Sequence, residues 1–144
     1  MKQEYSCGAI VFKIINDELN VLLVEQTLNH WGFPKGHMEK NETKQQTAIR
    51  EVKEETNIDI KLIDGFEEMN TYSPLPKTMK DVTYFVAYPT SFELIKQDSE
   101  IKVVSWYPIK KARDLITYES NKEILDKALN FYMDNLKKIK PLII

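Results

Sequence analysis

The sequence predicts an α/β (α+β) fold in which a mixed β-sheet carries helices on both faces. Two observations support this. Short apolar segments of strand-like composition occur in both halves of the chain. One helical segment lies between them, and two more follow at the C-terminal end. Because the apolar faces of sheets and helices are buried by packing in layers, we expect one layered domain spanning residues 1–144.

The first half of the chain begins with two predicted strands, residues 5–14 and 19–26. Asn16 and Asp17 between them are turn-forming residues, which predicts a hairpin. Residues 27–35 contain a glycine and a proline and are expected to form a loop.

The central helix has clear start and stop residues. Thr43 followed by Gln46 is a capping box. Residues 44–56 contain no glycine or proline and are rich in helix formers. Asn57 tolerates the left-handed conformation that ends many helices. We therefore expect a helix from about residue 44 to residue 56.

The second half of the chain predicts three more strands and two helices. Gly65 is expected to form a bulge in the first of these strands, and Pro108 fits the first position of a helix. In chain order, these elements are a strand at 58–69, a loop at 70–80, strands at 81–88 and 101–107, and helices at 108–116 and 119–138.

Composition excludes several classes of protein. The net charge of −2 gives no overall basic field for nucleic acid or anionic membranes. No apolar run is long enough to span a bilayer. Cys7 is the only cysteine, so no intramolecular disulfide can form, and it lies in an apolar strand where we expect it to pack in the core. A reducing, cytoplasmic location is expected.

The central helix carries a cluster of charges, Arg50, Glu51, Glu54 and Glu55. On a helical projection the three glutamates share an arc beside an apolar face formed by Ala48, Ile49 and Val52. Like charges this close repel each other. A solvated face with arginine and lysine pairs is one explanation. A hard divalent cation is another, because Mg²⁺ and Ca²⁺ prefer oxygen ligands.

The spacing around this cluster resembles the Nudix hydrolase motif, G-x5-E-x7-R-E-U-x-E-E-x-G-U, where U is aliphatic. The matching residues are Gly36, Glu42, Arg50, Glu51, Val52, Glu54, Glu55 and Ile58. Asn57 stands where the motif has glycine, and asparagine tolerates a positive φ better than most other residues. The resemblance implies an αβα sandwich in which the motif helix packs beside the sheet.

The resemblance also implies metal-dependent hydrolysis of a nucleoside diphosphate linked to another moiety, with a water molecule attacking phosphorus. It implies Mg²⁺, or Mn²⁺ in its place. The expected metal ligands are Gly36 (through its carbonyl), Glu51, Glu54, Glu55 and Glu100. Arg50 and Glu42 are expected to orient the carboxylates and the loop before the helix. Glu51, Glu54 and Glu100 are the candidates for the general base.

Outside the motif, the chain resembles the asymmetric diadenosine tetraphosphate hydrolases of this family. The resemblance rests on residues 30–37 (HWGFPKGH), Gly65-Phe66, Tyr72, Pro76-Lys77-Thr78, Ser99-Glu100 and Trp106. Lys35, Lys77 and His37 are candidates for phosphate contacts, although surface lysines are often only solvated. Tyr72, in the predicted loop, and Tyr118 could stack on a base or pack as ordinary rim residues.

The resemblance therefore implies a small nucleotide substrate, with diadenosine tetraphosphate cleaved to ATP and AMP. Alternatives within the family are RNA 5′-pyrophosphohydrolase, (d)NTP, diphosphoinositol polyphosphate and ADP-ribose hydrolysis. Pro74 lies near the position of a proline in ADP-ribose enzymes. A non-catalytic nucleotide-binding module is a further alternative, although such a module would be expected to lose the motif carboxylates. Nucleic acid is expected only as an RNA 5′ end, and the sequence leaves oligomeric state open.

Overall fold

The computed structural model describes residues 2–73, 75–97 and 99–143, with side chains as far as Lys137. Pro74 therefore lies outside the described residues. The strands are β1 Lys2–Ile15, β2 Glu18–Gln26, β3 Trp31–Gly32, β4 Lys35–His37, β5 Ile60–Tyr72, β6 Thr78–Pro89 and β7 Ile101–Pro108. The helices are α1 Lys44–Thr56, α2 Ile109–Leu115 and α3 Glu119–Ile143.

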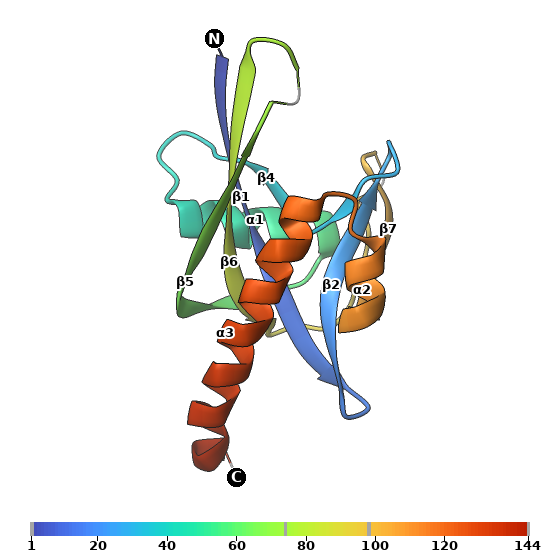
Figure 1. Ribbon diagram of the computed structural model, residues 1–144, viewed down its shortest axis with the longest axis vertical. Helices are drawn as coiled ribbons and strands as arrows, with labels where there is room; N and C mark the ends of the chain where they lie inside the picture. The colour runs from blue at the N-terminus through green and yellow to red at the C-terminus, as the bar shows by residue number, and fades with distance from the viewer. Residues whose placement is uncertain (1, 74, 98, 144) are drawn as a thin grey trace.

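The strands form one mixed sheet (Figure 1). Its strand order is β3-β2-β1-β6-β5, with β4 paired to β1 and β7 paired to β2. β1 and β2 are an antiparallel hairpin, and Asn16 (φ 50°) and Asp17 (φ 65°) both adopt the positive φ that a tight hairpin turn requires. β1 and β6 are parallel. The mixed sheet and the hairpin that the sequence predicts are therefore confirmed.

The sheet separates two hydrophobic cores, because alternate residues of each strand point to opposite faces. On one face, Ile10 and Phe12 of β1 pack with Leu125 and Tyr132 of α3 and with α2. On the other face, Ala9 and Val11 of β1 pack with Val52 of α1 and with Leu22 of β2. Helices therefore cover both faces, and α1 lies on the side opposite α3 (Figure 1). The predicted αβα layering is confirmed.

The predictions from the sequence were wrong for three local features. Tyr72 is the last residue of β5 and not a loop residue, because β5 and β6 pair as far as Tyr72 and Lys80. Ile49 is 40% exposed, since the buried stripe of α1 runs through Ala48, Val52 and Glu55 instead. Pro108 ends β7 and is the N-cap of α2, one position before the first helical residue.

Two other predictions hold. Gly65 has a φ of 111°, and the β5–β6 register shifts between Ile63 and Glu68, as a bulge requires. Cys7 is buried in the core between α1 and the sheet. Within the described part of the chain, no helix has the length and apolar character needed to cross a bilayer.

Candidate active site

Helix α1 begins and ends at the residues that the sequence indicates. The N–H of Gln46 donates to the hydroxyl of Thr43 at 3.1 Å, and the Gln46 side chain accepts the Thr43 N–H at 2.9 Å. Both bonds of a capping box are thus present. Asn57 has a φ of 68°, and its N–H donates to the Lys53 carbonyl at 2.8 Å. The asparagine therefore forms the left-handed C-cap at the motif's glycine position.

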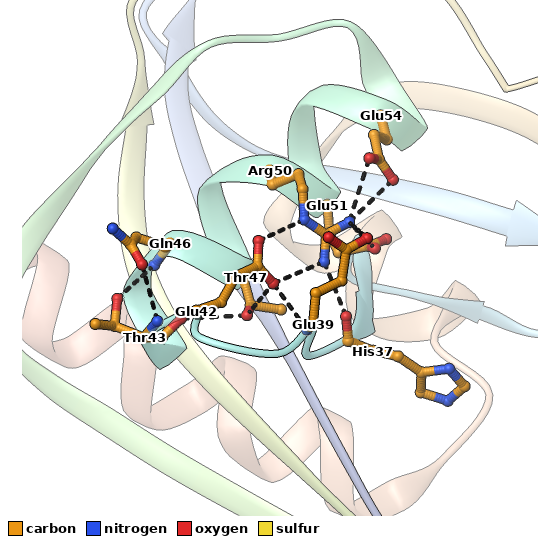
Figure 2. Close-up of polar contacts among 9 residues, drawn as sticks. All are labelled: His37, Glu39, Glu42, Thr43, Gln46, Thr47, Arg50, Glu51 and Glu54. Atoms are coloured by element: carbon orange, nitrogen blue, oxygen red, sulfur yellow. Dashed lines mark hydrogen bonds and ion pairs between the residues drawn. The ribbon is translucent and has the colours of Figure 1, made fainter.

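Arg50 is the centre of the polar contacts beside α1 (Figure 2). Its Nε and Nη2 donate to the two carboxylate oxygens of Glu42, at 2.6 and 2.9 Å. Nη1 donates to Glu51 at 2.7 Å and to Glu54 at 3.2 Å, and Nη2 also donates to the His37 carbonyl at 2.9 Å. Hydrogen bonding to these carboxylates raises the pKa of Arg50 further above its usual range.

Glu42 fastens the loop before α1 to the helix. Besides Arg50, it accepts the Glu39 backbone N–H at 2.9 Å and the Thr47 hydroxyl at 2.8 Å. The hydrogen bonds from Arg50, helped by the Glu39 N–H, lower the pKa of Glu42 to about 2. Glu42 and Arg50 together thus hold one side of the site as an ionised, hydrogen-bonded unit.

Glu51 lies against Gly36, which is on β4. The Glu51 carboxylate occupies the place that a Cβ at position 36 would take. The Glu51 side chain is only 14% exposed, and this burial raises its pKa in spite of Arg50. Close approach of a side chain to a backbone is a common reason for a glycine. It accounts here for the glycine that opens the motif.

Glu55 is the most buried of the motif carboxylates, at 4% exposure. It accepts the Lys35 backbone N–H at 3.1 Å. Burial raises the pKa of Glu55 to about 8, against the opposing effect of that N–H and of the Lys35 charge. Burial likewise lowers the pKa of Lys35 to about 8, and the nearby Lys80 ammonium lowers it further. The charges of Lys80 and Glu55 therefore both act on the Lys35 ammonium.

These residues surround a polar cavity of about 430 Å³, which we call the carboxylate pocket. Glu100, which precedes β7, lines the same cavity although it is far from α1 in sequence. The structure thus brings together the predicted ligands from the motif and beyond it. The pocket is lined by Gln26, Lys35, Gly36, His37, Glu39, Arg50, Glu51, Glu54, Glu55, Lys80, Gln97 and Glu100.

A second cavity of about 540 Å³, the aromatic pocket, shares Gln26 and Lys35 with the carboxylate pocket. Its lining includes the predicted Tyr72 and Tyr118, whose rings are stacked with centroids 6.2 Å apart and an interplanar angle of 28°. The other lining residues are Val24, Leu28, His30, Trp31, Gly32, Phe33, Ser73, Leu75, Tyr84 and Asn121. An apolar pocket with aromatic walls thus opens beside the charged one.

Of the predicted phosphate contacts, Lys35 and His37 line the carboxylate pocket, but Lys77 lines neither of these two cavities. Lys77 lies in the turn between β5 and β6, with a φ of 62°. A second lysine lines the carboxylate pocket beside Lys35: it is Lys80, which the sequence analysis did not identify. Lys80 lies on β6 between Glu4 of β1 and Tyr72 of β5. This position depends on strand pairing, and no local sequence pattern indicates it.

The chemistry of the donors fits a hard divalent cation, because five carboxylates and Gly36 line one cavity. Among the described residues, no three acidic, histidine or cysteine side chains already converge as a ready metal cage. Arg50 holds Glu51 and Glu54 by direct hydrogen bonds. This arrangement suits Mg²⁺, which retains several waters and needs few protein ligands.

The layered αβα fold places a glutamate-rich helix beside a polar cavity of about 430 Å³. The chain belongs to the Nudix family: residues 5–128 match the family model described as the NUDIX domain. The protein is accordingly a Nudix pyrophosphohydrolase.

Curated relatives include the bis(5′-nucleosyl)-tetraphosphatase [asymmetrical] of Sus scrofa, which is 30% identical over 88% of this chain and 93% of that protein. The Mus musculus enzyme of the same name is 29% identical over the same shares. Among solved structures, a Caenorhabditis elegans Ap4A hydrolase binary complex has a TM-score of 0.81 at 22% identity, covering 92% of this chain and 98% of that one. At that identity the likeness supports the fold alone.

Proposed function

We propose that this Nudix hydrolase uses Mg²⁺ to cleave nucleoside diphosphates linked to another moiety, and that its preferred substrate is diadenosine tetraphosphate, cleaved to ATP and AMP. The observation that carries the proposal is the joining of the aromatic pocket to the carboxylate pocket through Lys35 and Gln26. A base can lie in the first cavity while its phosphates extend into the second. The names of the mammalian relatives support the same substrate.

Glu51, Glu54, Glu55, Glu100 and the Gly36 carbonyl would hold the metal. Bound Mg²⁺, or Mn²⁺ in its place, would act as a Lewis acid on phosphate oxygens and lower the pKa of a coordinated water. Glu51 and Glu54 are at present hydrogen-bonded to Arg50, so the arginine acts as a positioning residue that keeps both carboxylates at the pocket. Glu42 in turn positions Arg50.

Lys35, Lys80 and His37 would offset the charge of the phosphate chain. Lys35 lies at the junction of the two pockets, so it can contact the phosphates nearest the base. Lys80 lines the carboxylate pocket beside it, and His37 lines the far side of that pocket. Charge-assisted bonds of this kind are stronger than neutral ones.

One of Glu51, Glu54 and Glu100 would accept the proton of the attacking water. All three line the carboxylate pocket. A general base must lie within hydrogen-bond reach of that water. Separate glutamine variants identify it, because loss of the base lowers kcat far more than the apparent affinity for Mg²⁺, whereas loss of a ligand changes both.

Tyr72 and Tyr118 would bind the base. Their ring centroids lie 6.2 Å apart with an interplanar angle of 28°, and a base inserted between two facing rings needs about twice a 3.5 Å van der Waals contact. A small outward movement of Tyr118, which is 44% exposed, provides this space. Tyr118 is also in edge contact with His30, at 5.4 Å between ring centroids.

We also propose a reducing, cytoplasmic location. The free thiol of Cys7 is buried, and burial raises its pKa to about 11, so it is a poor nucleophile for exchange reactions. Subcellular fractionation of cells that express the protein tests this. Recovery with a cytosolic marker agrees with the proposal, and recovery with a secreted marker contradicts it.

A substrate panel tests the proposed activity. The purified protein with Mg²⁺ is given diadenosine tetraphosphate, ADP-ribose, an oxidised deoxynucleoside triphosphate and 5′-triphosphorylated RNA, and kcat/KM is measured for each. We expect diadenosine tetraphosphate to have the highest value and Glu54→Gln to lose nearly all activity while remaining folded. A higher kcat/KM for another substrate would keep the Nudix chemistry but refute the assignment of diadenosine tetraphosphate.

A further inference from the structure

A third cavity, of about 580 Å³, adjoins the carboxylate pocket on the side away from the aromatic pocket; we call it the outer hollow. It shares His37 and Glu39 with the carboxylate pocket. The aromatic pocket shares Lys35 with that same pocket. The short strand β4, Lys35–His37, therefore runs past all three cavities in sequence.

The outer hollow is similar in size to the aromatic pocket, and it also offers an aromatic ring. Tyr5 of β1 lines it and is 55% exposed. Met38 lies beside it, and the Met38 N–H donates to the Tyr5 carbonyl at 3.0 Å, which fixes the two backbones together. An accessible ring and a thioether on a rigid backbone form a surface on which a flat heterocycle can stack.

The charges of the outer hollow oppose a further phosphate group. Three carboxylates line it, those of Glu4, Glu39 and Glu42. The basic side chains that line it both lie against one of these carboxylates: Lys2 Nζ is 3.4 Å from Glu4, and His37 Nε2 is 3.5 Å from the same carboxylate. A neutral ligand that donates hydrogen bonds fits such a lining better than an anion does.

We propose that the outer hollow binds the second nucleoside of a dinucleoside polyphosphate. Tyr5 stacks on its base, and the exposed Glu39 carboxylate accepts hydrogen bonds from its hydroxyl or amino groups. This inference rests on the proposed function, because it requires a substrate with a nucleoside at each end of the phosphate chain. Such a subsite would favour a dinucleotide, which ends in a neutral nucleoside, over a nucleotide that ends in a charged phosphate.

Two ligands that differ only at the far end test the proposal. Diadenosine tetraphosphate and adenosine 5′-tetraphosphate carry the same number of phosphates, but the second lacks the distal nucleoside. Their dissociation constants are measured by calorimetry with Mg²⁺, in a Glu54→Gln background that prevents turnover. The variants are Tyr5→Ala, Tyr5→Phe and the control Tyr88→Ala, which removes an exposed tyrosine from a strand region outside all three cavities.

We expect Tyr5→Ala to weaken diadenosine tetraphosphate binding about tenfold, within the range of base stacking on an aromatic side chain, and to leave adenosine tetraphosphate binding within about twofold. Tyr5→Phe keeps the ring and should bind as the background protein does, and so should Tyr88→Ala. Equal losses for both ligands, or no loss for either, would overturn the proposal. Failure of the wild-type protein to cleave the dinucleotide with Mg²⁺ would instead refute the proposed function, and this inference with it.

Discussion

The carboxylate of Glu51 occupies the space that a side chain at Gly36 would fill. This contact joins α1 to β4 at the centre of the carboxylate pocket, and both residues line that pocket. A glycine is therefore required there for a steric reason: the carboxylate could not otherwise reach its present position.

Gly36→Ala should displace the Glu51 carboxylate. Because a displacement of about 1 Å in a catalytic group can cost on the order of 10²-fold in rate, we expect kcat/KM to fall by about that factor and the concentration of Mg²⁺ at half-maximal rate to rise. Gly32→Ala is the matched control for folding, since its Cβ would meet only Asn121 Nδ2 at 3.8 Å, an ordinary contact. Its melting temperature should match that of the wild type. A Gly36→Ala enzyme with normal kinetics would contradict this steric role.

The Arg50–Glu42 pair should make stability depend on pH in a defined window. The pKa of Glu42 is lowered to about 2 in the folded protein by Arg50, against a usual value near 4.3 in the unfolded chain. A lowered folded-state pKa stabilises the fold above the unfolded pKa and loses this effect as pH falls toward the folded value. The stability difference between wild type and Glu42→Gln should thus be constant near neutral pH and shrink between about pH 4.3 and pH 2.

Urea unfolding of both proteins at several pH values measures this difference. Asp126→Asn is a suitable control, because Asp126 also forms two hydrogen bonds with an arginine, Arg113, at 3.1 Å each, but both side chains are over 40% exposed. Solvent screening should make its effect smaller. If the difference in the free energy of unfolding between wild type and Glu42→Gln grew as the pH fell, the proposed effect of Arg50 on Glu42 would be contradicted.

Lys80 and Lys77 should differ in their effect on activity. Lys80 lines the carboxylate pocket, whereas Lys77 lies in the β5–β6 turn. A charge-assisted hydrogen bond contributes about 1.5–3 kcal/mol, so Lys80→Met should lower kcat/KM by about tenfold or more. Lys77→Met should stay within about twofold of wild type. Steady-state kinetics on diadenosine tetraphosphate compares the two, and a greater loss in Lys77→Met would refute the placement of the phosphate chain beside Lys80.

Tyr118 should contribute to substrate binding mainly by stacking of its ring on the base. Base stacking on an aromatic side chain contributes about 1–3 kcal/mol, so Tyr118→Ala should raise KM for diadenosine tetraphosphate by roughly tenfold with a small change in kcat. Tyr118→Phe removes only the hydroxyl, which lies 3.4 Å from His30 Nδ1, and should keep KM near the wild-type value. If the phenylalanine variant lost as much as the alanine variant, the hydroxyl and not stacking would be the recognition element.

Local sequence signals predicted α1 well because its boundaries depend on neighbours within a few residues. Thr43 and Gln46 cap each other, and Asn57 supplies its own left-handed turn. The spacing of the motif also located the carboxylates on one helix. Their contacts with Gly36, Lys35 and Arg50 follow from the packing of that helix against β4.

The error at residues 70–80 has its cause in long-range strand pairing. The prolines of residues 70–80 suggested a loop, but β5 and β6 pair through that region, and Tyr72 lies opposite Lys80. Reading the segment as a loop placed Tyr72 outside a strand, and the resemblance through Pro76-Lys77-Thr78 selected Lys77 instead of Lys80. Strand register across a bulge such as the one at Gly65 depends on the whole sheet, so sequence patterns alone could not show that Tyr72 and Lys80 lie opposite each other.

Product analysis tests the central claim most directly. Diadenosine tetraphosphate is incubated with the wild-type protein and Mg²⁺, and the products are separated by anion-exchange chromatography at early times, with Glu54→Gln as the control. The account predicts equal amounts of ATP and AMP from the wild type and neither from the variant. Formation of ADP alone, or no product from this dinucleotide under conditions where ADP-ribose is hydrolysed, would contradict it.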